Sequence, residues 1–114
     1  MGGGQDMPEQ IANLGPAFVS LEQAAALIPD GAEVALGGRM QMEPVALARA
    51  LARLGRRGLR LVTAPGGGLG VDLLIGAGCV ASVESPQIVL NEFGQAPNFR
   101  REVQAGSVRV LDQV

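Results

Sequence analysis

The apolar positions of the chain fall into short blocks whose spacing alternates between two types. Residues 33–36 and 59–63 are runs rich in Val and Leu, as expected of strands buried on both faces. Each run ends in glycines and is followed by a block with helical spacing, at 44–54 and about 70–75. The alternation of strand, glycine loop and helix predicts an α/β domain with a mainly parallel sheet and flanking helices.

The first ordered element is expected to be a helix that begins after Ser20. Ser20 and Gln23 have the spacing of a capping box, in which each side chain bonds the other residue's backbone N–H. The helix should run to Ile28 and end at the turn-forming residues 29–31. In the next helix Pro44 is expected at the first helical position, where proline is favoured.

The second half of the chain continues the pattern less regularly. Residues 80–84 and 87–90 are candidate third and fourth strands, or one strand interrupted at 85–86. A last helix is expected at 97–104 and a last strand at 108–111, which would leave an unpaired sheet edge. The predicted organisation is a flexible lead over 1–18 and a partial α/β domain over 19–114, so the sheet is expected to be incomplete.

Composition narrows the possible chemistry. The 114-residue chain has a net charge of −2, and all nine of its basic residues are arginines. Without Lys or His there is no Schiff-base or P-loop lysine, no histidine base and no histidine metal ligand. Cys79 stands alone in an apolar stretch, which excludes an internal disulfide and a cysteine metal site and favours a small buried side chain. No metal and no tightly bound cofactor are expected.

Partners and location follow from the same composition. There is no basic tract of the kind that binds nucleic acid and no apolar run as long as a membrane span. The first residues lack the basic and apolar segments of a secretory signal peptide. We therefore predict a soluble, cytoplasmic protein without nucleic-acid or membrane partners.

Two glycine clusters are the main candidates for a binding site. Gly37 and Gly38 end the first predicted strand, and Gly66, Gly67 and Gly68 follow the second. Ligands bind at the carboxyl ends of strands in open α/β sheets, and glycine lets a backbone approach a ligand closely. The alternative is that both clusters are tight turns needed for packing. A P-loop is excluded because the chain has no lysine, and a dinucleotide-binding loop is disfavoured because the glycine spacing does not fit.

The order of several short segments resembles family I (heteromeric) CoA-transferase α subunits, especially the α chains of glutaconate CoA-transferase type. The resemblance extends over about residues 20–112 and includes a helix, an Asp-Gly turn and a strand that ends in a glycine pair. The matching segments are 20–25, 28–32, 34–38, 44–47 with 50–51, 59–63, 72–80, 91–94, 98–101 and 105–108. The family's α subunits are markedly longer than this chain.

The resemblance implies an α/β fold of the CoA-transferase (NagB/RpiA-like) type and a covalent mechanism. A glutamate carboxylate attacks an acyl-CoA thioester, forms an anhydride and then carries CoA as a glutamyl thioester. In the family that glutamate belongs to the β subunit, while the α subunit lines the cleft. The resemblance therefore implies a coenzyme A thioester and a small carboxylate as substrates, and a β subunit or a second copy as partner. Backbone amides of Gly37 and Gly38, and next of 66–68, could form an oxyanion hole.

Several charged side chains are further candidates. Arg39 could contact a substrate carboxylate or a CoA phosphate, or could be a surface arginine. Glu92 follows a predicted strand and precedes Gly94, so it is either a catalytic carboxylate or a solvated turn residue; Glu84 is a weaker candidate of the same kind. The remaining arginines near the second helix are expected on its solvent face: Arg49, Arg53, Arg56 and Arg57.

Three functions are compatible with these residues. The first is a CoA-transferase α-type chain that is inactive without its partner. The second is an acyl-CoA hydrolase or ring-opening enzyme of the same fold, in which Glu92 acts on water. The third is a truncated, non-catalytic chain that binds a partner through its sheet edge. The sequence indicates neither the acyl group nor the acceptor carboxylate.

Overall fold

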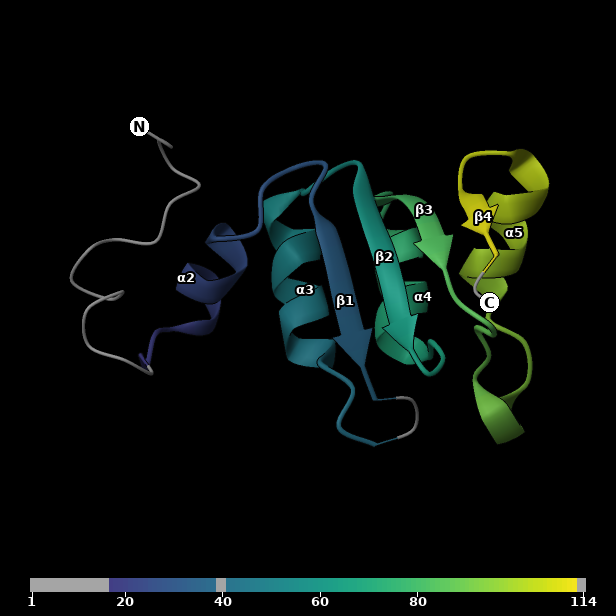
Figure 1. Cartoon of the computed structure of the whole chain (residues 1–114), viewed down its shortest axis with the longest axis horizontal. Helices are drawn as coiled ribbons and strands as arrows, with labels where there is room; N and C mark the ends of the chain where they lie inside the picture. The colour runs from purple at the N-terminus through teal and green to yellow at the C-terminus, as the bar shows by residue number, and fades with distance from the viewer. Residues whose placement is uncertain (1–16, 39–40, 113–114) are drawn as a thin grey trace.

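The computed structural model describes residues 17–38 and 41–112, which form one α/β unit (Figure 1). Helices, strands and a 3₁₀ turn alternate along the chain. In chain order the elements are α2 (Leu21–Ala26), β1 (Glu33–Gly37), α3 (Val45–Leu54), β2 (Leu59–Ala64), α4 (Leu69–Gly76), β3 (Val80–Glu84), η2 (Asn91–Phe93), α5 (Pro97–Ala105) and β4 (Arg109–Leu111).

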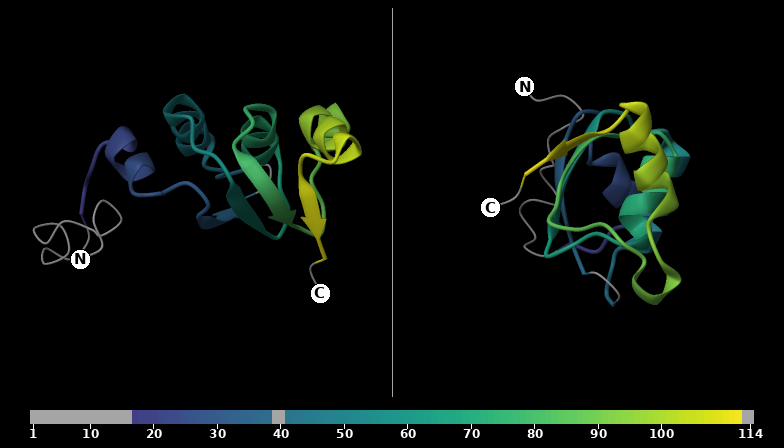
Figure 2. Two further views of the ribbon diagram at one scale, coloured as in Figure 1. Left: turned by 90° about the horizontal axis from the view of Figure 1, so that it is seen from above. Right: turned by 90° about the vertical axis from the view of Figure 1, so that its right-hand side faces the viewer.

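The four strands form one parallel sheet in the order β1-β2-β3-β4. Both views in Figure 2 place the helices on one side of this sheet. Neighbouring helices pack against one another in chain order, α2 on α3, α3 on α4 and α4 on α5. The predicted α/β class and parallel sheet are therefore confirmed, and within the described residues the second face of the sheet carries no helix.

The core lies between the sheet and the helices. Leu36, Leu61 and Val83 project from the strands toward the helices and are buried, as are Leu51 of α3 and Leu74 of α4. Burying such side chains contributes roughly 1.5–3 kcal/mol each and is the main stabilising term of the unit. The apolar spacing that predicted the helices is the spacing that fills this core.

The beginning of α2 follows the predicted capping box. The backbone N–H of Gln23 donates to Ser20 Oγ at 3.1 Å, and Gln23 Oε1 accepts from the Ser20 N–H at 2.8 Å. The helix ends at Ala26, two residues before the expected end, and the turn that follows contains Gly31 at φ +78°.

Two sequence predictions are corrected in detail. Pro44 is the N-cap of α3, not its first helical residue, so the helix begins one position later, at Val45. Residues 87–90 form no regular strand, because Ile88 pairs only with Gly67 and Val89 only with Gln95. Hydrogen bonds from Gly67 N–H to the Gln87 carbonyl (2.9 Å) and from Val89 N–H to the Gly67 carbonyl (3.1 Å) attach this segment to the glycine loop.

Arg49, Arg53 and Arg57 are exposed as predicted, whereas Arg56 is not. Arg56 is half-buried and its Nε donates to the Ile28 carbonyl at 2.8 Å. Arg57 donates from Nη1 to the carbonyls of Ala77 and Gly78, at 3.1 and 2.8 Å. Both side chains thus satisfy carbonyl groups at the ends of neighbouring helices, which have no partner within the helix.

Some sequence predictions fall on parts of the chain outside the described residues. The expected lead over 1–18 falls mostly on residues 1–16, which are outside them, as is Arg39. Within residues 17–38 and 41–112, no helix combines the length and the apolar character that crossing a bilayer requires.

Candidate functional site

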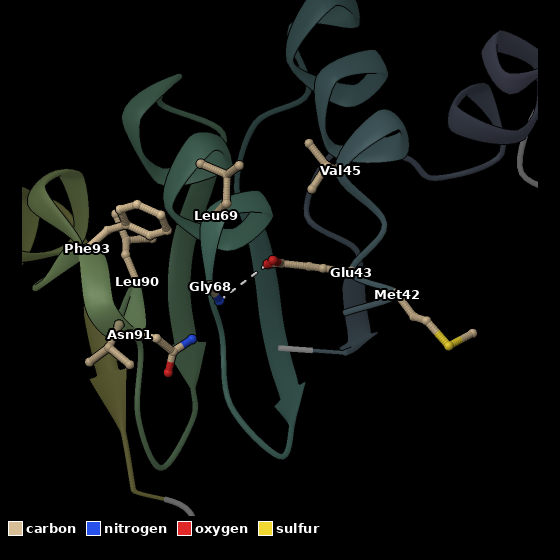
Figure 3. Close-up of a pocket in the computed structure, with 9 residues that line it drawn as sticks. Met42, Glu43, Val45, Gly68, Leu69, Leu90, Asn91 and Phe93 are labelled. Atoms are coloured by element: carbon tan, nitrogen blue, oxygen red, sulfur yellow. Dashed lines mark hydrogen bonds between the residues drawn. The ribbon is translucent and has the colours of Figure 1, made fainter. Parts of the chain in front are cut away.

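Three loops at the carboxyl edge of the sheet surround one cavity (Figure 3). They follow β1, β2 and β3, three neighbouring strands, and parallel strands bring their carboxyl ends to one edge. The cavity has a volume of about 440 Å³, within the range of small-molecule sites. Its lining residues are Met42, Glu43, Val45, Gly68, Leu69, Val89, Leu90, Asn91 and Phe93.

The two glycines after β1 differ in whether the structure has room for a side chain. Gly38 has φ +80°, and a Cβ there would lie 2.7 Å from the Gln41 carbonyl oxygen and 2.8 Å from the Glu43 nitrogen. Only glycine fits that position without moving the loop. A Cβ on Gly37 would meet nothing within 4 Å. Gly38 therefore shapes the loop that carries Glu43, whereas Gly37 leaves open space at the strand end.

Glu43 connects the loop after β1 to the helix after β2. Its Oε1 accepts hydrogen bonds from the backbone N–H groups of Gly68 (3.2 Å), Gly70 (2.8 Å) and Val71 (3.4 Å). A carboxylate is stabilised at a helix N-terminus by these unpaired N–H groups and by the helix dipole. Figure 3 shows the Glu43 side chain reaching toward Gly68.

The sequence pattern gives Glu43 no role beyond its place directly before the helix expected at 44–54. Its position could have indicated a role, since Glu43 is the last acidic residue before a helix and lies in a loop at the carboxyl edge of the sheet. What the sequence does not show is that the side chain crosses to α4, the next helix, and leaves the N-terminus of its own helix uncapped by a side chain.

Two non-glycine residues of the lining have left-handed backbone conformations. Met42 has φ +60° and Asn91 has φ +57°. This conformation is uncommon outside glycine, although asparagine adopts it more readily than most residues. Met42 is also almost fully exposed, and its side chain points away from the other lining residues (Figure 3). Strained backbone of this kind is concentrated at functional sites, so both residues favour the cavity as the site.

The second glycine cluster is buried and already hydrogen-bonded. The N–H of Gly67 donates to the Gln87 carbonyl, and that of Gly68 donates to Glu43. A Cβ on Gly67 would lie 3.1 Å from Val71 Cγ2 and 3.2 Å from Ile88 Cγ1. Of the two, Gly68 lines the cavity, and the N–H groups of both are satisfied within the chain.

The predicted carboxylates lie at the same edge but do not line the cavity. Glu92 belongs to η2 between the lining residues Asn91 and Phe93, and its side chain is exposed. Glu84 is half-buried at the end of β3. Within the described residues, no group of three or more carboxylate or thiol side chains is placed to hold a metal ion.

A second acidic side chain that the sequence did not single out organises the neighbouring helix. Asp72 of α4 is only 3% exposed, and its carboxylate accepts from the backbone N–H groups of Phe99 (2.7 Å) and Asn98 (3.3 Å) at the start of α5. It therefore does for α5 what Glu43 does for α4. The Glu43 contact joins the loop after β1 to α4, and the Asp72 contact joins α4 to α5.

A cavity bordered by the strand-end loops of a parallel α/β unit is typical of α/β ligand-binding proteins. The family follows from the sequence, because the profile of the coenzyme A transferase family matches residues 18–112. The chain belongs to the coenzyme A transferase family.

Two solved structures are similar to the chain. One is a cysteine-to-serine variant of the decarboxylase AibA/AibB, with 32% identity and a TM-score of 0.77 over 84% of this chain. The other is glutaconate coenzyme A-transferase from Acidaminococcus fermentans, with 26% identity and a TM-score of 0.76 over 83% of this chain. The resemblance to α chains of glutaconate CoA-transferase type is thereby confirmed. No curated protein matches the chain in sequence.

The chain spans 38% of the matched chain of the decarboxylase and 31% of that of the transferase. The larger part of each relative thus has no counterpart in this chain.

Proposed function

We propose that this chain acts as an α-subunit-like part of a coenzyme A transferase and supplies the glycine-loop walls of an acyl-CoA and carboxylate site. The observation that carries the proposal is the convergence of three successive strand-end loops on one cavity, with Gly38 and Gly68 in two of them. Membership of the coenzyme A transferase family supplies the reaction class. The substrates are then an acyl-CoA thioester and a small carboxylate, without a tightly bound cofactor.

The nucleophile in this proposal is a glutamate of a partner β subunit. Its carboxylate attacks the thioester carbonyl, which forms a mixed anhydride and releases the CoA thiolate. The thiolate then attacks the glutamyl carbonyl, so that the original acid leaves and a glutamyl-CoA thioester remains. A second carboxylate repeats the two steps in reverse, and CoA ends on the new acid.

In these steps the role of this chain is to bind and orient. Gly38 gives the loop after β1 a backbone conformation that a residue with a side chain would not fit. Gly37 leaves space for the approach of a thioester carbonyl. Backbone donors at such a position stabilise the oxyanion of a tetrahedral intermediate. We assign Gly66, Gly67 and Gly68 to the wall, because the N–H groups of the last two already donate within the chain. Arg39 stays a candidate contact for a substrate carboxylate or a CoA phosphate.

The need for a partner is supported by the bare face of the sheet. Ala35 of β1 lies beside Val62 of β2, and Gly37 lies beside Ala64, on the face that has no helix. All-parallel sheets are covered on both faces in known folds, so a β subunit or a second copy of this chain would be expected to cover this one.

A hydrolytic function with Glu92 as the base has weaker support. The exposed Glu92 side chain is not part of the cavity lining. The similarity to a decarboxylase shows that one fold serves different reactions, which makes a direct test necessary.

The test measures binding and acyl exchange separately. The purified chain is titrated with acetyl-CoA by calorimetry and is assayed for exchange of radiolabelled acetate with acetyl-CoA. Binding without exchange is expected, and Gly38→Ala should weaken binding at least about tenfold, since it displaces the loop. Gly106→Ala is the matched control, because Gly106 has φ +81° but ends α5, away from the cavity.

Two outcomes would contradict the proposal. If the chain does not bind acetyl-CoA, it has no acyl-CoA site. If the chain alone exchanges acetate rapidly, the nucleophile does not belong to a partner, and loss of that activity in Glu92→Gln would assign it to Glu92.

A further inference from the structure

The cavity at the carboxyl edge has a chemical character that the family does not specify. Its lining is predominantly aliphatic and aromatic, from Val45, Leu69, Val89, Leu90 and Phe93. Asn91 and Glu43 are its polar side chains. We infer that this cavity binds the acyl chain of the thioester and selects an uncharged, apolar chain over one that ends in a second carboxylate. The inference rests on the proposed function and names the substrate class of the same site.

The exposure of the apolar lining supports a ligand. Leu69 is 53% exposed and Phe93 is 82% exposed, although both are large apolar side chains. They extend from different segments, since Leu69 begins α4 and Phe93 ends η2. Figure 3 shows Leu69, Leu90 and Phe93 on one side of the cavity and Val45 on the other. Apolar surface gathered around a concave site marks a place where a partner molecule buries it.

The charge of the lining determines which acyl chains fit. Among the described residues that line the cavity none is basic, and Glu43 is the only charged one. Its Oε1 already accepts three backbone hydrogen bonds, so the carboxylate is held in place by the start of α4. A second carboxylate on the substrate would lose water and face a fixed like charge, which opposes binding. An alkyl chain would instead cover Leu69 and Phe93.

The experiment compares two thioesters of equal chain length. Hexanoyl and adipoyl thioesters of N-acetylcysteamine differ in the terminal group, methyl or carboxylate, and omit most of CoA. Binding to the full 114-residue chain is followed by NMR of the leucine and valine methyl groups. The expected result is at least about tenfold tighter binding of the hexanoyl thioester, with the largest shifts at Leu69, Val89 and Leu90.

Two variants connect this preference to the cavity. Phe93→Ala should weaken hexanoyl binding by about three- to tenfold, because it removes apolar contact area without disturbing the core. Phe18→Ala is the matched control, since Phe18 is fully exposed and is not part of the cavity lining. Glu43→Gln keeps an acceptor oxygen for α4 and removes the charge, so it should raise adipoyl affinity severalfold relative to hexanoyl affinity.

Several results would overturn the inference. These are equal affinity for the two thioesters, preference for the adipoyl thioester, no binding of either, and equal effects of Phe93→Ala and Phe18→Ala. The acetyl-CoA titration described under the proposed function distinguishes a failure of this inference from a failure of the proposed function itself. If acetyl-CoA binds and the hexanoyl preference is absent, only the acyl-chain assignment is wrong. If self-association rather than thioester binding shifts the Leu69 and Leu90 methyl groups, the apolar surface is a protein contact and the inference fails.

Discussion

Asp72 and Phe99 are joined by a 2.7 Å hydrogen bond from the Phe99 backbone N–H to the Asp72 carboxylate. The same carboxylate accepts from the Asn98 N–H at 3.3 Å, and it is 3% exposed. The first N–H groups of a helix have no partner within the helix, and α5 has no cap from its own N-cap residue. A buried acid on one helix thus caps the next.

Asp72→Ala is therefore expected to lower the free energy of unfolding by about 3 kcal/mol. It removes two hydrogen bonds to a charged group and leaves the N–H groups at the start of α5 without their acceptor. Asp72→Asn should cost less, since an amide oxygen still accepts one bond. Urea denaturation measures the change, with Asp112→Ala, an exposed acid, as the control. Equal stability of Asp72→Ala and Asp112→Ala would show that the cap does not contribute.

The two glycines after β1 provide a second prediction with a built-in comparison. Gly38→Ala should destabilise the unit by about 2 kcal/mol, because alanine is strained at φ +80° and its Cβ would clash with backbone at 2.7 Å. Gly37→Ala should change stability by less than about 0.5 kcal/mol, since its Cβ meets nothing. Urea denaturation of both variants checks the difference, and equal losses would mean that the loop adapts.

Much of the fold could be predicted from spacing alone. The capping box at Ser20, the apolar runs of β1 and β2 and the glycines that end them are local signals, and each matches the structure. The alternation of strands and helices was sufficient to predict the parallel sheet. The failures concern contacts between distant segments. Residues 87–90 have strand-like composition, but their backbone pairs with the loop at Gly67 and not with the sheet.

The position of the cavity could be predicted from the sequence, but the residues that line it could not. The carboxyl edge and the glycine loops followed from the general rule for α/β sheets. Glu43 and Asp72 were missed because each acts across the fold, 27 residues from a main partner, Gly70 and Phe99 respectively. The exposed Phe93 was likewise inconspicuous in sequence, since its place in the cavity lining depends on the path of η2.

A third prediction concerns acid pH at the end of α5. The pKa of Glu102 is lowered because Ser107 Oγ donates to its carboxylate at 2.6 Å and Arg101 donates to it at 2.9 Å. A carboxyl group with a lower pKa in the folded state stabilises the fold above its unfolded pKa. That contribution is lost as the pH falls through the folded pKa.

Ser107→Ala should therefore raise the pKa of Glu102 toward its ordinary value and flatten this part of the stability profile. An NMR titration of the Glu102 carboxyl carbon between about pH 2 and 7 measures the shift. Arg101→Ala should move the pKa in the same direction. A pKa that does not change in Ser107→Ala would show that the serine hydrogen bond has no effect in solution.

The last prediction is that the thiol of Cys79 is unreactive and takes no part in the site. Cys79 has no exposed surface, and burial raises its pKa, an effect that the nearby Arg57 guanidinium partly opposes. It directly precedes β3, so it lies at the amino end of a strand whose carboxyl end faces the cavity. Because the thiolate is the reactive form, alkylation by iodoacetamide at about pH 8 should be slow in the folded chain and fast in urea.

Cys79→Ala should accordingly leave acetyl-CoA affinity unchanged within about twofold while costing roughly 1 kcal/mol of stability through lost packing. Calorimetry and urea denaturation of the same variant measure the two effects independently. If alkylation were as fast in the folded chain as in urea, the burial of the thiol would be wrong. If Cys79→Ala lost acetyl-CoA binding while remaining folded, the site would extend to the opposite end of the sheet, and the assignment of the cavity to the carboxyl edge would fail.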